Sequence, residues 1–344
     1  MLHHYGEACM ILVTGATGRL GGQIVRLLRA AKMDVRALVR AGSEYFWLND
    51  TGCTYFFGDL RDPQSLRRAA KGCSHVIHAA GVEVESSENH HSVTTLQGSI
   101  DLVEAAKLRG AQHFVMVSCI GAGRGYENPQ FDSQRQAEEH LRASGLSHTI
   151  LRCAPFVEEF AKLAKDCADG ERPRFWGSKD AQISPLARRD AALFSVACLD
   201  HPSAKQATLE IGGPETVQME ALVQLALDKA GAQAGPVWSG AGSLVAANLA
   251  RVAGRRWKHW IQRQALLYGE DHAVDMAGLS ADLGLPLTSI DQALDEALAA
   301  WVPGQDPDDR NEKVVHRQFQ ATVYSPGEVL WEDLPDGPLR DTDD

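Results

Sequence analysis

The stretch Gly15-Ala16-Thr17-Gly18-Arg19-Leu20-Gly21 decides the fold of this chain. It follows the apolar run Ile11-Leu12-Val13, which is typical of a buried strand, and it precedes apolar residues at helical spacing. In such a turn the first glycine permits the tight bend, the second lets backbone approach a pyrophosphate, and the third lets the helix pack against the strand. The helix N-terminus then presents N–H groups and a partial positive charge to the anion. We therefore predict a dinucleotide-binding turn.

Strand-like and helix-like patterns alternate on both sides of this turn. The further apolar runs are Val35–Val39, Thr54–Phe57, Val76–Ala79, Phe114–Val117 and Thr149–Leu151, with helical spacing between them. One helix start is explicit, because Asp62-Pro63 offers an N-cap residue followed by proline at the first helical position. Alternation of this kind requires βαβ crossovers. It predicts an α/β protein with a doubly wound, Rossmann-type parallel sheet.

The same patterns divide the chain into four predicted parts. We expect an N-terminal extension at 1–9, a dinucleotide-binding domain at 10–154, a smaller mixed region that meets substrate or partner at 155–302, and a partly mobile acidic tail at 303–344. The tail has eleven carboxylates and four basic side chains, so it holds -7 of the formal net charge of -11. The rest of the chain is close to neutral.

Composition excludes several classes of function. A net charge of -11 argues against general nucleic-acid binding. No apolar run approaches the roughly 20 residues of a membrane span, and no signal-peptide pattern opens the chain. The seven cysteines are scattered without a C-x-x-C pair, and His3-His4 and His90-His91 lack matching ligand spacing, so we predict free thiols, no metal and a cytoplasmic protein. The oligomeric state stays open.

Two arginines favour NADP(H) over NAD(H). A site for NAD usually places a carboxylate about 20 residues past the glycines to bind the ribose 2′-OH. This chain has Arg40 at that point, after the second strand, and Arg19 inside the glycine turn. Guanidinium groups suit a 2′-phosphate, although both could also be solvated surface side chains.

Ordered motifs along residues 10–230 resemble the atypical short-chain dehydrogenase/reductase superfamily, and within it the NmrA-like branch. Besides the glycine turn they are Gly58-Asp59-Leu60, His78-Ala79-Ala80-Gly81, Val117-Ser118, Ser144-Gly145-Leu146, Thr149-Ile150-Leu151-Arg152, Arg189-Asp190-Ala191 and Gly212-Gly213-Pro214-Glu215. The resemblance implies that the adenine, the ribose and phosphates, and the nicotinamide meet three successive strand ends. The cofactor-binding residues expected from the turn, the arginines and the resemblance are Gly15, Thr17, Gly18, Arg19, Leu20, Gly21, Arg40, Asp59, Leu60, Ala79, Ala80, Gly81, Ser118 and Gln134.

The sequence departs from that family at the catalytic position. Its reductases commonly carry Tyr-x-x-x-Lys on the helix after the fifth strand, and some NmrA-like members keep only the lysine. Here the helix has Phe131, and Gln134 stands where the lone lysine is expected; a register shift of one would bring in Arg135. Glutamine can bind a ribose but cannot supply a proton. The remaining catalytic candidates are Ser118, Tyr126 and Gln134, with Tyr126 reaching in from the preceding loop.

Two functions follow from these features. The first, which we favour, is an NADPH-dependent reductase of a small carbonyl, quinone or conjugated acceptor. The second is an NADP(H)-sensing regulator or assembly factor that acts through a protein partner. The loss of the Tyr/Lys pair, the acidic tail and the basic-aromatic stretch Arg255–Trp260 favour the second function. That stretch is predicted to form an amphipathic helix over the pocket or against a partner.

Overall fold

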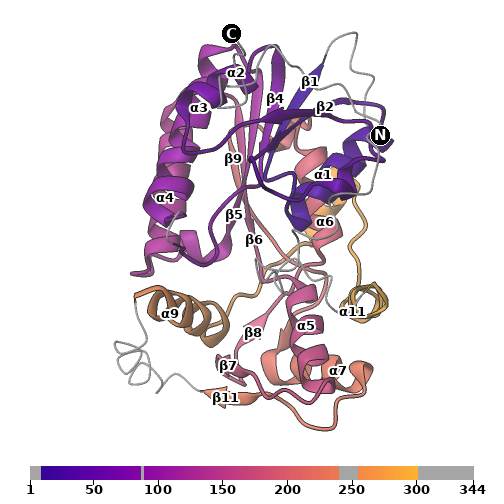
Figure 1. The fold of residues 1–344 in the computed structure, drawn as a ribbon. Helices are drawn as coiled ribbons and strands as arrows, with labels where there is room; N and C mark the ends of the chain where they lie inside the picture. The colour runs from indigo at the N-terminus through magenta and orange to yellow at the C-terminus, as the bar shows by residue number, and fades with distance from the viewer. Residues whose placement is uncertain (1–8, 87–88, 240–254, 301–344) are drawn as a thin grey trace, which may run out of the picture.

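The computed structural model describes residues 9–86, 89–239 and 255–300, and its centre is a seven-stranded parallel sheet (Figure 1). The strands lie in the order β3-β2-β1-β4-β5-β6-β9, and every neighbouring pair is parallel. The order reverses between β1 and β4, which places the ligand crevice of an open α/β sheet at their carboxyl ends. The strands are β1 Met10–Thr14, β2 Asp34–Val39, β3 Thr54–Phe57, β4 Cys73–His78, β5 His113–Cys119, β6 His148–Cys153 and β9 Ala207–Ile211.

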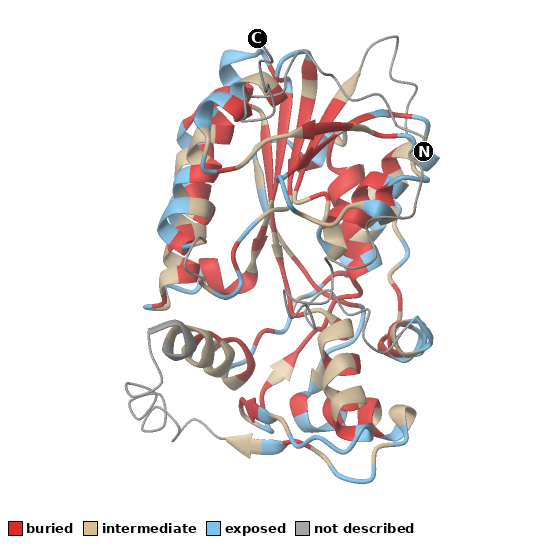
Figure 2. Cartoon of the chain, viewed as in Figure 1, coloured by how far each residue is buried: buried red, intermediate tan, exposed pale blue. Residues whose placement is uncertain are grey.

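Helices cover both faces of this sheet. One face carries α1 packed against α6, and the other carries α2, α3 and α4 (Figure 1). Each face has its own apolar core, and Figure 2 shows the strands between them as mostly buried. The predicted doubly wound α/β fold is therefore confirmed. These helices are α1 Arg19–Ala30, α2 Pro63–Ala69, α3 Gly98–Leu108, α4 Pro129–Ala143 and α6 Arg188–Ala197.

A smaller group of elements lies beyond the carboxyl edge of the sheet (Figure 1). It contains the antiparallel pair β10-β8 and the parallel pair β11-β7. Helices α5, α7 and α11 pack around a third apolar core, in which Phe160 and Phe175 are buried. The elements are α5 Val157–Ala168, β7 Arg174–Trp176, β8 Gln182–Ile183, β10 Val217–Gln218, α7 Met219–Ala230, β11 Val237–Ser239, α9 Arg255–Gly269 and α11 Ile290–Ala299. Helix α10, Ala277–Leu283, packs instead against the apolar core on the α1 and α6 face of the main sheet.

Local sequence signals account for most of the boundaries. Each predicted strand in the first half of the chain coincides with an observed one to within three residues at either end. At the predicted helix start, the Asp62 side chain accepts a hydrogen bond from the Gln64 backbone N–H at 2.9 Å, as an N-cap should. The helix after β4 begins with a π-helical segment, η2 His91–Gln97, that continues into α3. Three short 3₁₀ segments are η1 Phe46–Leu48, η3 Ile120–Gly123 and η4 Pro202–Ala204.

The main sheet draws on more of the chain than residues 10–154. Strand β9 pairs with β6, and α6 packs on α1, although both come from the range 155–302. A division at residue 154 stays a prediction. Of the extension at 1–9 the structure describes Cys9 alone, and the tail at 303–344 lies outside the described residues. Within the described ranges, no helix has both the length and the apolar character required to cross a membrane.

Candidate cofactor and acceptor site

The glycine turn has the close packing that a dinucleotide site needs. Gly15 has a φ of +72°, which favours glycine, and a Cβ there would lie 2.6 Å from the Ala79 carbonyl oxygen. A Cβ on Gly21 would lie 2.0 Å from the Gly15 carbonyl oxygen, so only glycine fits. Helix α1 starts after Gly18 with no side-chain cap and no acidic residue in its first turn. Its positive end therefore faces the crevice without a competing carboxylate, as an anion site requires.

The residues expected at the adenine and its ribose lie at the ends of β2 and β3. Arg40 is exposed after β2, and its Nη1 donates to Asn89 Oδ1 at 3.2 Å. Asp59 follows β3 and accepts from Arg61 Nε at 2.9 Å and from Arg61 Nη2 at 2.6 Å. Burial raises the pKa of the Asp59 carboxyl, but the hydrogen bonds from Arg61 and the charge of Arg40 outweigh it and hold that pKa below its usual value. Leu60 is buried.

The segment after β4 is fixed to the glycine turn by backbone contact. The Ala79 N–H donates to the Thr14 carbonyl oxygen at 3.1 Å, which holds Ala79 against the end of β1. Ala79 and Ala80 are half-buried, and Gly81 is exposed. Thr17 is half-buried and Leu20 packs on the first core. The structure thus brings the predicted turn and the predicted β4 segment to one edge of the sheet.

Behind that edge lies a chain of buried polar groups. Thr14 Oγ1 is 2.6 Å from His78 Nδ1, and His78 Nε2 is 2.8 Å from Ser99 Oγ. Ser99 Oγ also donates to the Thr95 carbonyl oxygen, and Thr95 Oγ1 accepts from the Val82 N–H at 3.0 Å. These contacts link β1, β4, the following loop and η2, so they fix the segment expected to hold ribose and phosphates.

Ser118 is committed to a buried ionic cluster. Its Oγ donates to Glu138 Oε1 at 2.6 Å, and Glu138, on α4, is fully buried. Arg152 Nη2 donates to Glu138 Oε2 at 2.6 Å, and Arg142 Nη1 lies 3.3 Å from the same oxygen. A buried carboxylate with this many charge-assisted hydrogen bonds holds its partners in place. The Ser118 hydroxyl therefore points to α4 rather than standing free for chemistry.

Gln134 is paired with a cysteine at the end of β5. Cys119 Sγ, at the end of β5, donates to Gln134 Oε1 at 2.7 Å, and both side chains are half-buried. Burial raises the pKa of the Cys119 thiol to about 11. Phe131 is buried, and a Cβ on Gly121 would lie 2.5 Å from its ring. Phe131 therefore packs under the loop after β5.

Tyr126 is tied to the end of α9 instead of the strand edge. Its hydroxyl donates to Glu270 Oε2 at 2.6 Å, and its ring lies 5.7 Å from Phe131 and 6.2 Å from His272, between centroids. Burial and the hydrogen bond to Glu270 raise the pKa of Tyr126 above its usual value. Arg135 pairs with Asp132 and Glu139 on an exposed face of α4. These contacts place the sequence candidates in separate environments.

The predicted helix at Arg255–Trp260 lies within α9, but sequence reasoning missed the contacts that α9 makes. Asn128 Nδ2 donates to the His259 carbonyl oxygen at 3.1 Å, and Gln262 Nε2 donates to the Glu127 carbonyl oxygen at 2.9 Å. These bonds fix α9 against the loop before α4. Arg263, one helical position further on, is only 8% exposed, and its Nη1 lies 3.5 Å from Glu83 Oε1. No local signal could have found this pair, because 180 positions separate the two residues.

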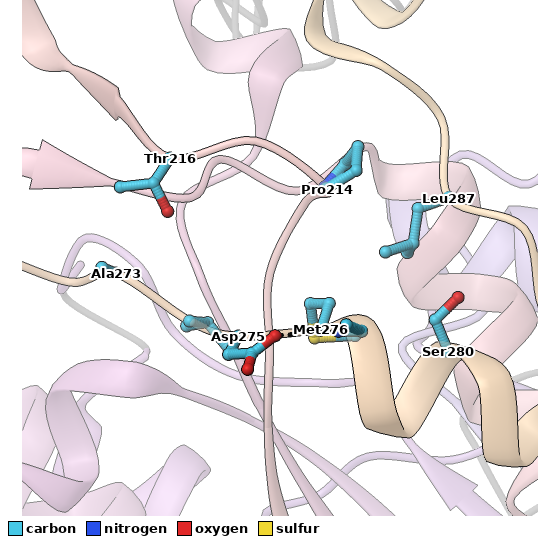
Figure 3. A pocket seen from close by; sticks show the side chains of 9 residues that line it. Pro214, Thr216, Ala273, Asp275, Met276, Ser280 and Leu287 are labelled. Carbon is cyan, nitrogen blue, oxygen red and sulfur yellow. Dashed lines mark hydrogen bonds between the residues drawn. The ribbon is translucent and has the colours of Figure 1, made fainter.

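A separate hollow of about 730 Å³ lies away from the glycine turn (Figure 3). It is lined by Pro214 and Thr216 after β9 and by the segment that leads into α10, including Asp275 and Met276. Three strands, β4, β5 and β6, separate β9 from β1 in the sheet. The hollow is therefore not the predicted cofactor crevice. Among the described residues, no group of three or more His, Cys, Asp or Glu side chains could hold a metal ion.

Comparison with known proteins adds three findings. A family model described as NAD(P)H-binding matches residues 15–202. An NAD(P)H azoreductase from Xenophilus azovorans is 29% identical over 209 residues, which cover 60% of this chain and 69% of that protein. A photosystem II assembly factor, Ycf39, from Guillardia theta is 29% identical over 218 residues, 62% of this chain and 68% of that protein.

A solved structure shares the fold. The NADPH-dependent quinone oxidoreductase from Escherichia coli, complexed with NADPH, is similar with a TM-score of 0.64 at 19% identity, over 83% of this chain and 99% of that one. At this identity the likeness concerns the fold alone.

Proposed function

The chain belongs to the NAD(P)H-binding family, and from that premise we propose that it is an NADPH-dependent reductase of a small carbonyl, quinone or conjugated acceptor. The glycine turn is the observation that carries this proposal. Only glycine fits at Gly21, and the uncapped start of α1 points into the crevice between β1 and β4. Such a turn accepts the pyrophosphate of a dinucleotide on backbone N–H groups.

The preference for NADPH is supported by the charges beside the adenine end. Arg40 stands exposed after β2, where a site for NAD usually has a carboxylate. The nearest carboxylate that we place there, Asp59, is already bound by Arg61 at two atoms. A ribose 2′-phosphate would therefore meet an exposed guanidinium rather than a negative charge. Asn89, which Arg40 contacts, would lie beside the same phosphate.

When bound, NADPH supplies a hydride. Cys119, at the end of β5, and its partner Gln134 on α4 bind and orient the reactants rather than exchange protons with them. The Cys119 thiol, with its pKa raised to about 11, stays protonated near neutral pH, and Gln134 cannot lose or gain a proton in that range. The proton that completes the reduced acceptor then comes from water. A site without a proton-donating side chain suits acceptors such as quinones, whose reduction can take its protons from water.

A regulator or assembly factor is the second candidate. Helix α4, Pro129–Ala143, contains neither tyrosine nor lysine. The hydroxyl groups of Ser118 and Tyr126 are both donated to carboxylates, those of Glu138 and Glu270. A chain that binds NADP(H) without reducing an acceptor would retain the glycine turn and show this same lack of a proton donor. The similarity to an assembly factor supports this candidate as well.

Titration of the purified chain with NADPH and with NADH, followed by tryptophan fluorescence, separates these functions. Consumption of the reduced cofactor is then monitored with quinones, aldehydes and azo dyes. We expect tighter binding of NADPH than of NADH, followed by turnover of at least one acceptor class. Tight binding without turnover would replace the reductase by the regulator. Failure to bind either cofactor would contradict both.

A further inference from the structure

Arg263 is a buried cation whose hydrogen-bonding capacity is largely unused. Its side chain is 10% exposed, and its single hydrogen bond within the described residues is the 3.5 Å contact from Nη1 to Glu83 Oε1. Its Nε is buried and has no hydrogen-bond partner there. A guanidinium carries five N–H donors, and burial of a charge is costly unless those donors are paired. The Glu83 side chain is 55% exposed, so it does not satisfy this guanidinium by itself.

The other groups around Arg263 are occupied with one another. Tyr268 donates its hydroxyl to Glu159 Oε2 at 2.6 Å, and its ring stacks on Phe175 with centroids 5.3 Å apart. Glu159 is therefore bound by a tyrosine, and no hydrogen bond joins it to Arg263 among the described contacts. Within the described residues, no group binds the Nε of Arg263.

Arg263 lies at the carboxyl edge of the sheet, beside the region in which an acceptor would have to bind. Glu83 follows the predicted cofactor segment at Ala79–Gly81, and α9 is fixed to the loop before α4 by the bonds of Asn128 and Gln262. Arg263 therefore lies beside the loops that follow β4 and β5, and β4 is one of the two strands that flank the crevice.

We propose that Arg263 binds the acceptor oxygen and stabilises the negative charge that forms on it, which selects carbonyl compounds and quinones over cationic acceptors. This inference rests on the proposed reductase function. The C–H bond of the reduced nicotinamide breaks and a C–H bond forms on the acceptor carbon, while the π electron pair of C=O moves to oxygen. The N–H groups of Arg263 hold that oxygen until water protonates it. Arg263 keeps its own proton throughout, because guanidinium does not deprotonate in proteins.

Binding of benzoate to the NADP⁺-loaded protein tests the oxygen site without turnover. Benzoate carries the oxygen charge that the proposal requires, and benzamide is its neutral control. We expect the native chain to bind benzoate about tenfold more tightly than benzamide, because hydrogen bonds to charged groups carry that much free energy. Arg263→Gln should remove the preference, and Arg263→Lys should keep part of it. Arg189→Gln, which removes an exposed guanidinium paired with Glu296, should change nothing.

Three results of the binding experiment would overturn this role of Arg263. The first is a native chain that binds benzoate and benzamide equally, and the second is an Arg263→Gln variant that keeps the preference. The third is an Arg263→Gln variant that loses NADP⁺ affinity by the same factor as it loses benzoate affinity. That result would assign the guanidinium to the cofactor. Thermal unfolding of Arg263→Met distinguishes a role in ligand binding from a role in stability. We expect an unchanged or higher Tm, since an incompletely paired buried cation is replaced by apolar volume. A lower Tm would contradict the assignment.

Turnover measurements keep this inference distinct from the proposed function. If the native chain reduces an acceptor, Arg263→Gln should lower kcat more than it raises KM, because the guanidinium acts on charge that develops in the transition state and is absent from the bound acceptor. If the native chain reduces nothing while the Arg263-dependent preference for benzoate holds, the reductase function fails and the oxyanion site stands. Turnover that is unaffected in Arg263→Gln overturns the role of Arg263 and leaves the reductase function intact.

Discussion

Gly21 and Gly22 are neighbours in the first turn of α1, but the space around them differs. A Cβ on Gly21 would lie 2.0 Å from the Gly15 carbonyl oxygen, whereas a Cβ on Gly22 would meet its nearest atom, the Ala16 carbonyl oxygen, at 3.5 Å. Gly21→Ala must therefore displace the turn, and we expect it to weaken NADPH binding by more than about tenfold. Gly22→Ala is the matched control and should raise the free energy of unfolding by roughly 0.5–1 kcal/mol. Fluorescence titration and urea unfolding measure both; equal effects would show that close packing at Gly21 is not what the site requires.

Arg40 tests which cofactor the chain prefers. A 2′-phosphate distinguishes NADPH from NADH, and a guanidinium after β2 can bind it through charge-assisted hydrogen bonds. Arg40→Asp replaces that attraction by repulsion, so the ratio of the two affinities should shift toward NADH by about tenfold or more. Arg26→Gln, on the exposed pair with Asp50, controls for the loss of one surface cation. Equal losses for NADPH and NADH would remove the basis for an NADP(H) preference.

The elements of the main sheet could be predicted because their signals are local. The run Ile11–Val13 appears inside β1, and Asp62 caps α2 as its residue type suggests. Apolar periodicity and capping depend on residues a few positions apart, and a sequence shows these directly. The π-helical form of η2 was not predictable in this way, because a segment of seven residues is too short to show its own period. Its buried Thr95 is instead held by the Val82 N–H, across a loop.

The packing of one element on another could not be predicted. Cys119 and Gln134 meet because β5 and α4 adjoin, and the sequence separately shows only a cysteine after a strand and a glutamine in a helix. Arg263 stands on α9, and no spacing rule indicates that this helix turns back to Glu83, 180 positions earlier. Ser118, a candidate that the family resemblance suggested, lies at the carboxyl end of β5. Its hydroxyl nevertheless donates a hydrogen bond to the buried carboxylate of Glu138. Such partners follow from tertiary topology, which a motif does not contain.

The stability of the whole molecule depends on a histidine that must stay neutral. His78 is buried at 2% exposure between Thr14 and Ser99, at the centre of the polar chain behind the cofactor edge. Burial lowers the pKa of His78 to about 4, from its ordinary value of 6.5. The unfolded chain therefore binds a proton at pH values where the folded chain does not. The stabilising contribution is complete above pH 6.5 and is lost as the pH falls toward 4.

That linkage predicts the effect of pH on unfolding. Between pH 7.5 and pH 5 the native chain should lose about 2 kcal/mol of unfolding free energy through His78 alone. His78→Gln retains a side chain that can bond to both hydroxyl partners but has no proton to gain, so its loss over this interval should be smaller by that amount. Urea unfolding of both proteins at the two pH values measures the difference, and their free energies at pH 7.5 show the direct cost of the substitution. If both proteins lose the same free energy, protonation of His78 does not couple to folding. Acid sensitivity would then come from other buried groups, among them His113, whose pKa burial also lowers to about 4.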